Sequence, residues 1–421
     1  DTHPPHKPPH FKHLNPQARK PASGRMSVLF SYAFRPLFLL ATLYALLIVP
    51  YWVAAWLGAH PMPSTLGTPV WWHAHEMIFG FAGAAIGGFA LTAVATWTKR
   101  APVAGAPLIA LCAFWLIARV VFAAPFPMLL PLAIAADLSY GALLLALMSR
   151  EVVLARNQRN YKVLLLLALL LASNALFFAG LSRGASWVMA TLLAAMWFVV
   201  WLISLIAGRI IPGFTRNWLK HQVAVKQLEP AALPPAFDRL DLFTTGLLVL
   251  FGASQVAGAP SLATAVLGCI TGALLLVRLG RWQGRRAFRE PLVWVLHVAF
   301  AWIPIGVFLL SAAELGLVPR TAGTHALTSG AISTMVVAIA SRAALGHTGR
   351  PLESHPLLTA AYAWITLAAV LRVAATFGPA ARVLLMASST AWTLGFLCFA
   401  WRYVPILTQA KEVSPRSLPT V

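Results

Sequence analysis

Long apolar runs separated by short polar segments fill most of the chain. Each run is close to the roughly 20 residues that an α-helix needs to cross the hydrocarbon core of a bilayer. The pattern therefore predicts an all-α, polytopic integral membrane protein with about 12 transmembrane helices in the lipid bilayer. We expect them near residues 35–57, 73–97, 102–122, 128–149, 162–181, 186–208, 240–258, 260–279, 291–312, 323–343, 356–377 and 380–402.

Polar stretches divide this series of helices. Residues 1–33 are rich in Pro and His and bury little apolar surface, so a disordered cytoplasmic tail is expected. Residues 209–239 form the one long loop, also expected to be cytoplasmic, and residues 404–421 a second tail. The loop separates six helices in 34–208 from six in 240–403. We find no motif shared between these two halves, so the sequence does not support an internal repeat.

Composition and charge agree with a membrane protein. Hydrophobic residues make up 59% of the chain and charged residues 10%, against about 25% charged in soluble domains. The net charge of +21 would suit nucleic-acid binding, but the basic residues gather in alternate short loops. The opposite loops hold only Arg183, Arg320 and Arg382. This asymmetry excludes a nucleic-acid interface and predicts that both termini are cytoplasmic.

Ionisable residues inside the apolar runs are the candidates for function. A charge at the centre of a membrane helix costs about 2.5–3.5 kcal/mol, so such residues are rarely accidental. The set comprises His73, His75, Glu76, Arg119, Asp137, His297, His325 and Arg372, with His347 at the inner edge of its run.

The segment WWHAHEM opens the second run, near the predicted outer face. In a helix, His73 and Glu76 share a face that the following glycines continue, and His75 points elsewhere. In an extended segment, His73 and His75 point the same way. Either arrangement offers two imidazoles and a carboxylate as metal ligands. The alternative is an interfacial cap anchored by the two tryptophans.

The remaining histidines lie at two depths. In an α-helix, His325, Ser329 and Ser333 would form a polar stripe facing the bundle interior. His325 lies in the outer half, whereas His297 and His347 lie in the inner half. Imidazoles ligate haem iron and also suit copper. Two metal centres, or one centre plus structural histidines, are both consistent with this pattern.

Three further charges lie within the runs. Arg119 and Arg372 lie about one turn below the outer ends of their helices, where they either snorkel to the interface or pair with carboxylates of a cofactor, such as haem propionates. Asp137 lies near the middle of the fourth run. It is a candidate for relaying protons, for pairing with an arginine, or for a protonated core acid.

Several segments resemble the NnrS family of bacterial membrane proteins. They are FRPLFLLATLY at 34–44, WHAHEMIFGFAGAAIGGFALTA at 72–93, GRIIPGFTRNW at 208–218, VLHVAFAWIPIG at 295–306 and HALTSGAISTMVVAIASRAALGHTGRPL at 325–352. The resemblance implies twelve spans in the bacterial inner membrane, bound haem, copper, and a role in nitric-oxide metabolism and resistance to nitrosative stress. One departure is Gly213, where the family pattern leads us to expect proline. We expect it to loosen the loop that contains it.

The resemblance covers the histidines. His73, His75, His297, His325 and His347 become the expected ligands of one or two haem b groups and of copper. Given such a cofactor, Arg119 and Arg372 are the candidate cofactor-binding cations, and Glu76 and Asp137 the candidate catalytic groups that pass protons. The expected chemistry is detoxification of nitric oxide, in its fullest form reduction of NO to N2O with electrons from quinol or from a second haem.

Two other classes of function stay open at this stage. Twelve helices also suit a transporter or permease, which would favour interrupted helices at the membrane midplane. Pro304 and Gly306 are expected to break the ninth run, although no counterpart is seen in the first half. The third hypothesis is a non-catalytic, haem-based NO sensor or a metal-insertion factor. The sequence leaves the oligomeric state open.

Overall fold

The computed structural model describes residues 25–62, 65–124, 126–226 and 232–410. These parts form helices and contain no strand. Twelve helical segments within them are long and apolar enough to cross a membrane, which confirms the predicted all-α membrane protein. They are α2 (Phe34–Trp56), α3 to α4 (Pro69–Thr98), α5 (Ala106–Ala123), α6 (Leu130–Leu154), α7 (Tyr161–Gly180), α8 (Ala185–Lys226), α9 (Arg239–Ala257), α10 (Ser261–Arg281), α11 (Pro291–Glu314), α12 to α13 (Arg320–His347), α14 (Pro356–Ala374) and α15 (Ala381–Thr408).

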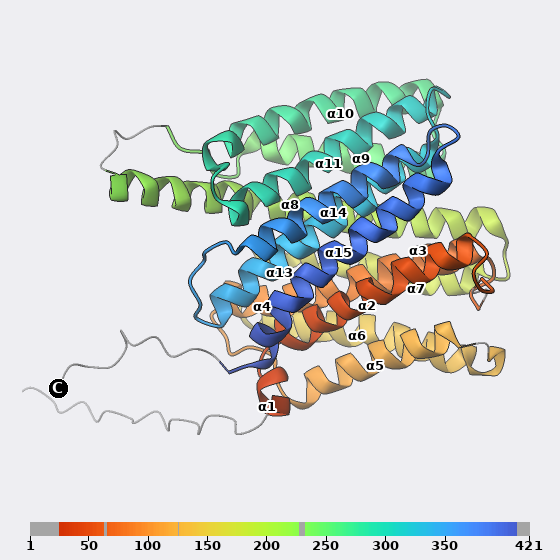
Figure 1. Cartoon of the computed structure of the whole chain (residues 1–421), viewed down its shortest axis with the longest axis horizontal. Helices are drawn as coiled ribbons and strands as arrows, with labels where there is room; N and C mark the ends of the chain where they lie inside the picture. Colours follow the sequence, from red (N-terminus) through yellow and green to blue (C-terminus); the bar gives the residue numbers. More distant parts are fainter. Residues whose placement is uncertain (1–24, 63–64, 125, 227–231, 411–421) are drawn as a thin grey trace, which may run out of the picture.

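The helices lie side by side in one bundle (Figure 1). The short helix α1 (Arg25–Leu29) and the last turn of α15 lie at the same end of it, which we call the terminal end. The opposite end, the far end, holds α3 (Pro69–His75) and α12 (Arg320–His325). By the predicted topology, the terminal end faces the cytoplasm.

Helix packing repeats every four spans. In each group the first span contacts the second (α2 with α4, α7 with α8, α11 with α13) and the third contacts the fourth (α5 with α6, α9 with α10, α14 with α15). The fourth span of each group then packs against the first span of the next. The bundle thus consists of three groups of four helices rather than two of six, so comparing the two halves of the sequence could not detect the repeat.

The second span of each group lies at the centre. The α3–α4 span, α8 and the α12–α13 span contact one another in all three pairings. They are among the most buried spans, with 78%, 67% and 67% of their most apolar stretches inside the protein. The ring around them is closed by the first and last spans, where the Trp392 indole donates a hydrogen bond of 2.8 Å to the carbonyl of Ala45.

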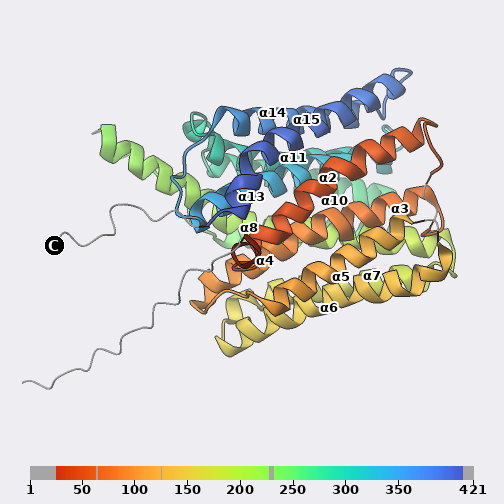
Figure 2. The same ribbon diagram turned by 60° about the horizontal axis from the view of Figure 1, so that its bottom comes forward.

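Helix α8 is longer than expected. It continues through Pro212 and Gly213 to Lys226, 42 residues in all, so the prediction of a loop from residue 209 is wrong for residues 209–226. The extra turns project beyond the terminal end (Figure 2). Ile211 and Leu219 are buried, and we attribute the continued helix to this packing, which outweighs the helix-breaking tendency of proline and glycine. Gly213 therefore lies within a helix and loosens no loop.

Helix α11 also runs without interruption, from Pro291 to Glu314, with Pro304 inside it. The expected break of the ninth span at Pro304 and Gly306 is wrong. Gly306 instead allows close packing, because a Cβ there would lie 2.6 Å from the Cγ of Leu327.

Candidate functional site

Two of the central spans share an uncommon local structure. After α3 the backbone forms a π-helical segment, η1 (Glu76–Ala82), before α4 (Gly83–Thr98) begins. After α12 it forms η5 (Ala326–Ile332), followed by α13 (Ser333–His347). Each π-segment follows directly on a histidine, His75 or His325. Such segments are rare in proteins overall, but they occur frequently at functional sites.

Neighbouring side chains add hydrogen bonds to backbone carbonyls in or next to the π-segments. In the second span the Trp115 indole donates to the carbonyl of Gly80 at 2.9 Å, and the Tyr140 hydroxyl donates to that of Gly83 at 2.8 Å. In the tenth span the Ser333 hydroxyl donates to the Thr328 carbonyl at 3.1 Å. Along this segment His325 and Ser329 are half-buried and Ser333 is buried.

A buried polar cluster lies beside η1. It joins side chains from five spans: Tyr44, His75, Glu76, Arg119, Asp137 and Asn174. His75 and Glu76 are completely buried, and Arg119, Asp137 and Asn174 nearly so.

Both ring nitrogens of His75 face oxygen acceptors in this buried polar cluster. Its Nδ1 lies 3.0 Å from Oε1 of Glu76, and its Nε2 lies 3.0 Å from Oδ1 of Asn174 and 3.3 Å from Oδ2 of Asp137. Four phenylalanine rings surround the imidazole. The geometry suits an imidazolium that donates from both nitrogens, and a metal would have to displace one of these partners.

Arg119 completes the charge balance of the cluster. Its guanidinium hydrogen-bonds to Asp137, and its Nε lies 3.2 Å from Oε2 of Glu76, which also accepts the hydroxyl of Tyr44. Two carboxylates thus face one guanidinium and one imidazolium, which lowers the cost of burying the charges. Of the interpretations open for Asp137, pairing with an arginine is the one observed. Arg119 has protein carboxylates as partners and needs none from a cofactor.

A second group lies at the far end of the bundle. It consists of the far-end histidine pair, His73 and His325, together with Arg372. His73 stacks on Trp52 with ring centroids 4.4 Å apart and planes inclined by 9°. Its Nδ1 is buried and has no hydrogen-bond partner among the described residues. Nδ1 of His325 donates to the Thr321 carbonyl at 2.8 Å, which leaves Nε2 as the acceptor nitrogen.

The three members of this group come from three spans and interact electrostatically. His325 and Arg372 lie close enough to His73 for their charges to act on it, and Arg372 acts on His325 in the same way. Within residues 25–410, leaving out the short gaps, Arg372 forms no salt bridge with a carboxylate. A histidine held by one nitrogen to a carbonyl is typical of a metal ligand, and an unpaired arginine suits an anionic group.

The side chains at the far end fit a haem group better than a free metal ion. The described residues contain no group of three or more His, Cys, Asp or Glu side chains placed to hold a metal ion. Haem iron needs only one or two protein ligands, because the macrocycle supplies the others. The far-end histidine pair supplies two imidazoles, and Arg372 a cation for a propionate.

The other two histidines lie toward the terminal end. His297 is buried and both nitrogens have partners, Nδ1 with the Val293 carbonyl at 3.1 Å and Nε2 with the Trp282 carbonyl at 3.4 Å. The ring of His347 lies 5.1 Å from that of Tyr32 and 5.7 Å from that of Phe34. The structure brings neither of them to the far-end pair.

The sequence analysis missed three residues in or next to these two groups. Tyr44, Asn174 and Trp52 are uncharged, so they did not stand out as ionisable residues within an apolar run. Asn174 is the most polar residue in the middle of its run and could have been singled out, but its partner Asp137 lies on another span.

Comparison with known proteins adds the family. A family model described as NnrS protein matches residues 28–411, nearly the whole chain. The chain belongs to the NnrS family. No match is found among curated proteins. The resemblance seen in the separate motifs of this NnrS protein thus extends over all twelve spans, including both π-segments.

Proposed function

We propose that this NnrS protein is a haem-binding membrane protein that handles nitric oxide, with the haem held between the second and tenth spans. Membership of the family supports a nitric-oxide-related, haem-binding membrane protein at the level of the family. The observation that carries the proposal is that His73, His325 and Arg372, from three different spans, lie within range of one another's charges at the far end of the bundle. Bound there, haem b would supply a redox-active iron that binds NO.

The two imidazoles would have unequal roles. His325 is oriented by its hydrogen bond to Thr321, which makes it the firmer ligand. His73 is held by stacking on Trp52, and no hydrogen bond fixes its buried Nδ1. His73 would therefore be held less firmly than His325. Arg372 would pair with a propionate.

The buried polar cluster is proposed to supply protons. Reduction of two NO molecules to N2O and water consumes two protons and two electrons. Asp137 contacts the imidazole of His75, which lies between His73 and Glu76 in the chain. Glu76 lies three residues after His73 in the same span, and the Tyr44 hydroxyl already donates to it. Glu76 is therefore the group proposed to hold the transferred proton. A membrane quinol is the proposed electron donor.

Copper and cellular location complete the proposal. Copper is retained from the family resemblance, although the described residues offer no group of three ligands for it. The family resemblance supports the bacterial inner membrane, and the charge asymmetry of the loops supports cytoplasmic positions for both termini.

The test begins with the full chain purified in detergent, its absorption spectrum in oxidised and reduced forms, and its iron and copper content. We expect haem in the unaltered protein and its loss in His325→Ala. His73→Ala should keep haem with an altered spectrum, and His297→Ala should match the unaltered protein. Full haem content in both His73→Ala and His325→Ala, or a folded protein without iron, would overturn the proposal.

Catalysis is tested separately from binding. Steady-state NO consumption with a quinol analogue should fall strongly in Glu76→Gln while haem content stays the same. A haem-loaded protein that binds NO without consuming it would identify a sensor instead of an enzyme. A folded, haem-free protein would favour the transporter hypothesis.

A further inference from the structure

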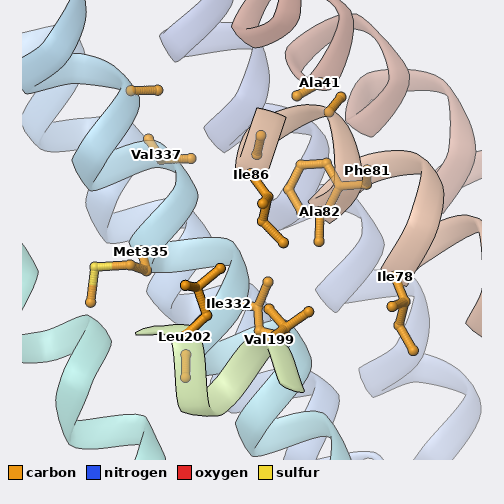
Figure 3. Packing of buried hydrophobic residues seen from close by; sticks show 14 of the residues in the cluster. Ala41, Ile78, Phe81, Ala82, Ile86, Val199, Leu202, Ile332, Met335 and Val337 are labelled. Carbon is orange, nitrogen blue, oxygen red and sulfur yellow. The ribbon is translucent and has the colours of Figure 1, made fainter. Parts of the chain in front are cut away.

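The three central spans line an apolar cavity. It holds about 570 Å³ of space between its lining atoms, part of which is open to the surroundings, and its lining comes from α2, the α3–α4 span, α8 and the η5–α13 segment. Ile86, Val199, Leu202 and Ile332 point toward one another from three of these helices (Figure 3). The cavity is distinct from the buried polar cluster and from the far-end pair, since none of their residues line it.

The chemistry of the lining restricts what can enter. The lining side chains are alanine, valine, leucine, isoleucine and phenylalanine, and the single heteroatom among them is the thioether sulfur of Met335. A buried water needs two to four polar partners, and cavities of this kind stay dry. Polar or charged ligands are excluded for the same reason.

The cavity extends from buried residues of the central spans to partly exposed ones such as Phe89, Ile203 and Val336, and is therefore partly open. Ile86, Leu202, Ile332 and Met335 all lie on central spans and are less than a tenth exposed. The cavity begins at Ala82 and Ile332, the last residues of the two π-segments. Ile332 follows His325 by the seven residues of η5, less than two helical turns along the tenth span. The space thus lies on the terminal side of the proposed haem site.

We propose that this cavity is a binding site for a small apolar gas, and that its ligand is nitric oxide on its way to the haem. NO is small, uncharged and weakly hydrogen-bonding, so it enters dry apolar space readily. A reservoir in the centre of the bundle would raise its concentration beside the iron. The nature of the gas rests on the proposed function, whereas the presence of a gas site does not.

Xenon tests the site without haem or NO. Crystals of the full chain pressurised with xenon should show anomalous scattering from xenon bounded by Ile86, Leu202 and Ile332. Ala85→Phe places a ring in the cavity and should abolish that signal. Ala113→Phe, the same change at an exposed position of α5, should leave it. Ile86→Ala enlarges the cavity and should keep or increase xenon occupancy, which guards against misfolding of the filled variant.

Nitric oxide tests the role. In haem-loaded protein, Ala85→Phe should slow NO binding to the iron several-fold after flash photolysis, with haem content and absorption maxima unchanged. Ala113→Phe should bind NO at the unaltered rate. Equal rates in the two variants would overturn the role as a reservoir, even if xenon binds.

Other occupants give different results. Density for an acyl or isoprenoid chain in the cavity, or failure of xenon to bind, would overturn the proposal whatever the haem content. A change of the haem spectrum in Met335→Leu would show that the thioether ligates iron and that the macrocycle occupies the space, which would also overturn it. Loss of haem alone would overturn the proposed function and leave the xenon result standing.

Discussion

Arg119 lies between Glu76 and Asp137 in a part of the bundle where almost no solvent reaches any of the three side chains. In such surroundings a charge is tolerated because its partners are in place, and it becomes costly once one is removed. The same reasoning applies to His75, whose two ring nitrogens both face oxygens of this cluster. The residues of the cluster therefore depend on one another for stability as well as for any proton transfer.

We expect Arg119→Gln to destabilise the fold by about 3–5 kcal/mol, because it leaves two buried carboxylates facing each other. Arg382→Gln, at an exposed position, should change stability by less than about 0.5 kcal/mol. Adding Asp137→Asn to Arg119→Gln should recover part of the loss. Thermal unfolding in detergent measures all three. Equal stability of the two single variants would show that the ion pairs contribute nothing.

The π-segments are the feature of helix structure that most affects the site. Both are seven residues long, both follow a histidine, and both have glycine at the fifth position, Gly80 and Gly330. A Cβ on Gly80 would lie 2.9 Å from Nη1 of Arg119 and 2.9 Å from Cε1 of Tyr44. The glycine thus lets two members of the buried polar cluster approach the backbone of η1.

Two glycine-to-alanine changes should have opposite effects. Gly80→Ala should destabilise the protein by about 1–3 kcal/mol, because the added methyl group overpacks the cluster. Gly213→Ala meets no atom within 4 Å and lies inside α8. It should stabilise the helix by about 0.5–1 kcal/mol. Thermal unfolding of both variants against the unaltered chain provides the check, and a destabilising Gly213→Ala would argue that α8 ends earlier.

At the scale of the whole molecule, the arrangement in three groups of four determines which spans reach the centre. The second, sixth and tenth spans meet there, and they carry His73, His75 and His325 as well as most of the cavity lining. The outer spans supply the polar partners Arg119, Asp137 and Asn174. Function is thus proposed to lie between the groups and within none of them alone.

The predicted orientation can be measured on the intact chain. Green fluorescent protein fused to the C-terminus should fluoresce, because both termini are expected in the cytoplasm. Alkaline phosphatase inserted after Leu317, an exposed residue between the ninth and tenth spans, should be active. The same insertion after Arg289, in a basic loop, should be inactive. The reverse pattern would place the far-end histidine pair at the cytoplasmic face.

The sequence by itself determined the fold class, because apolar runs of membrane-spanning length leave the backbone few alternatives to helix. It also named the charged site residues, since ionisable groups in an apolar run are costly and therefore conspicuous. Which of them meet was decided only by tertiary structure. Arg119 is bound by protein carboxylates and Arg372 is not, His75 lies in an ionic cluster while His73 stacks on Trp52, and α8 passes through a proline and a glycine. These outcomes depend on packing between distant spans, and neither hydropathy nor local residue spacing encodes it.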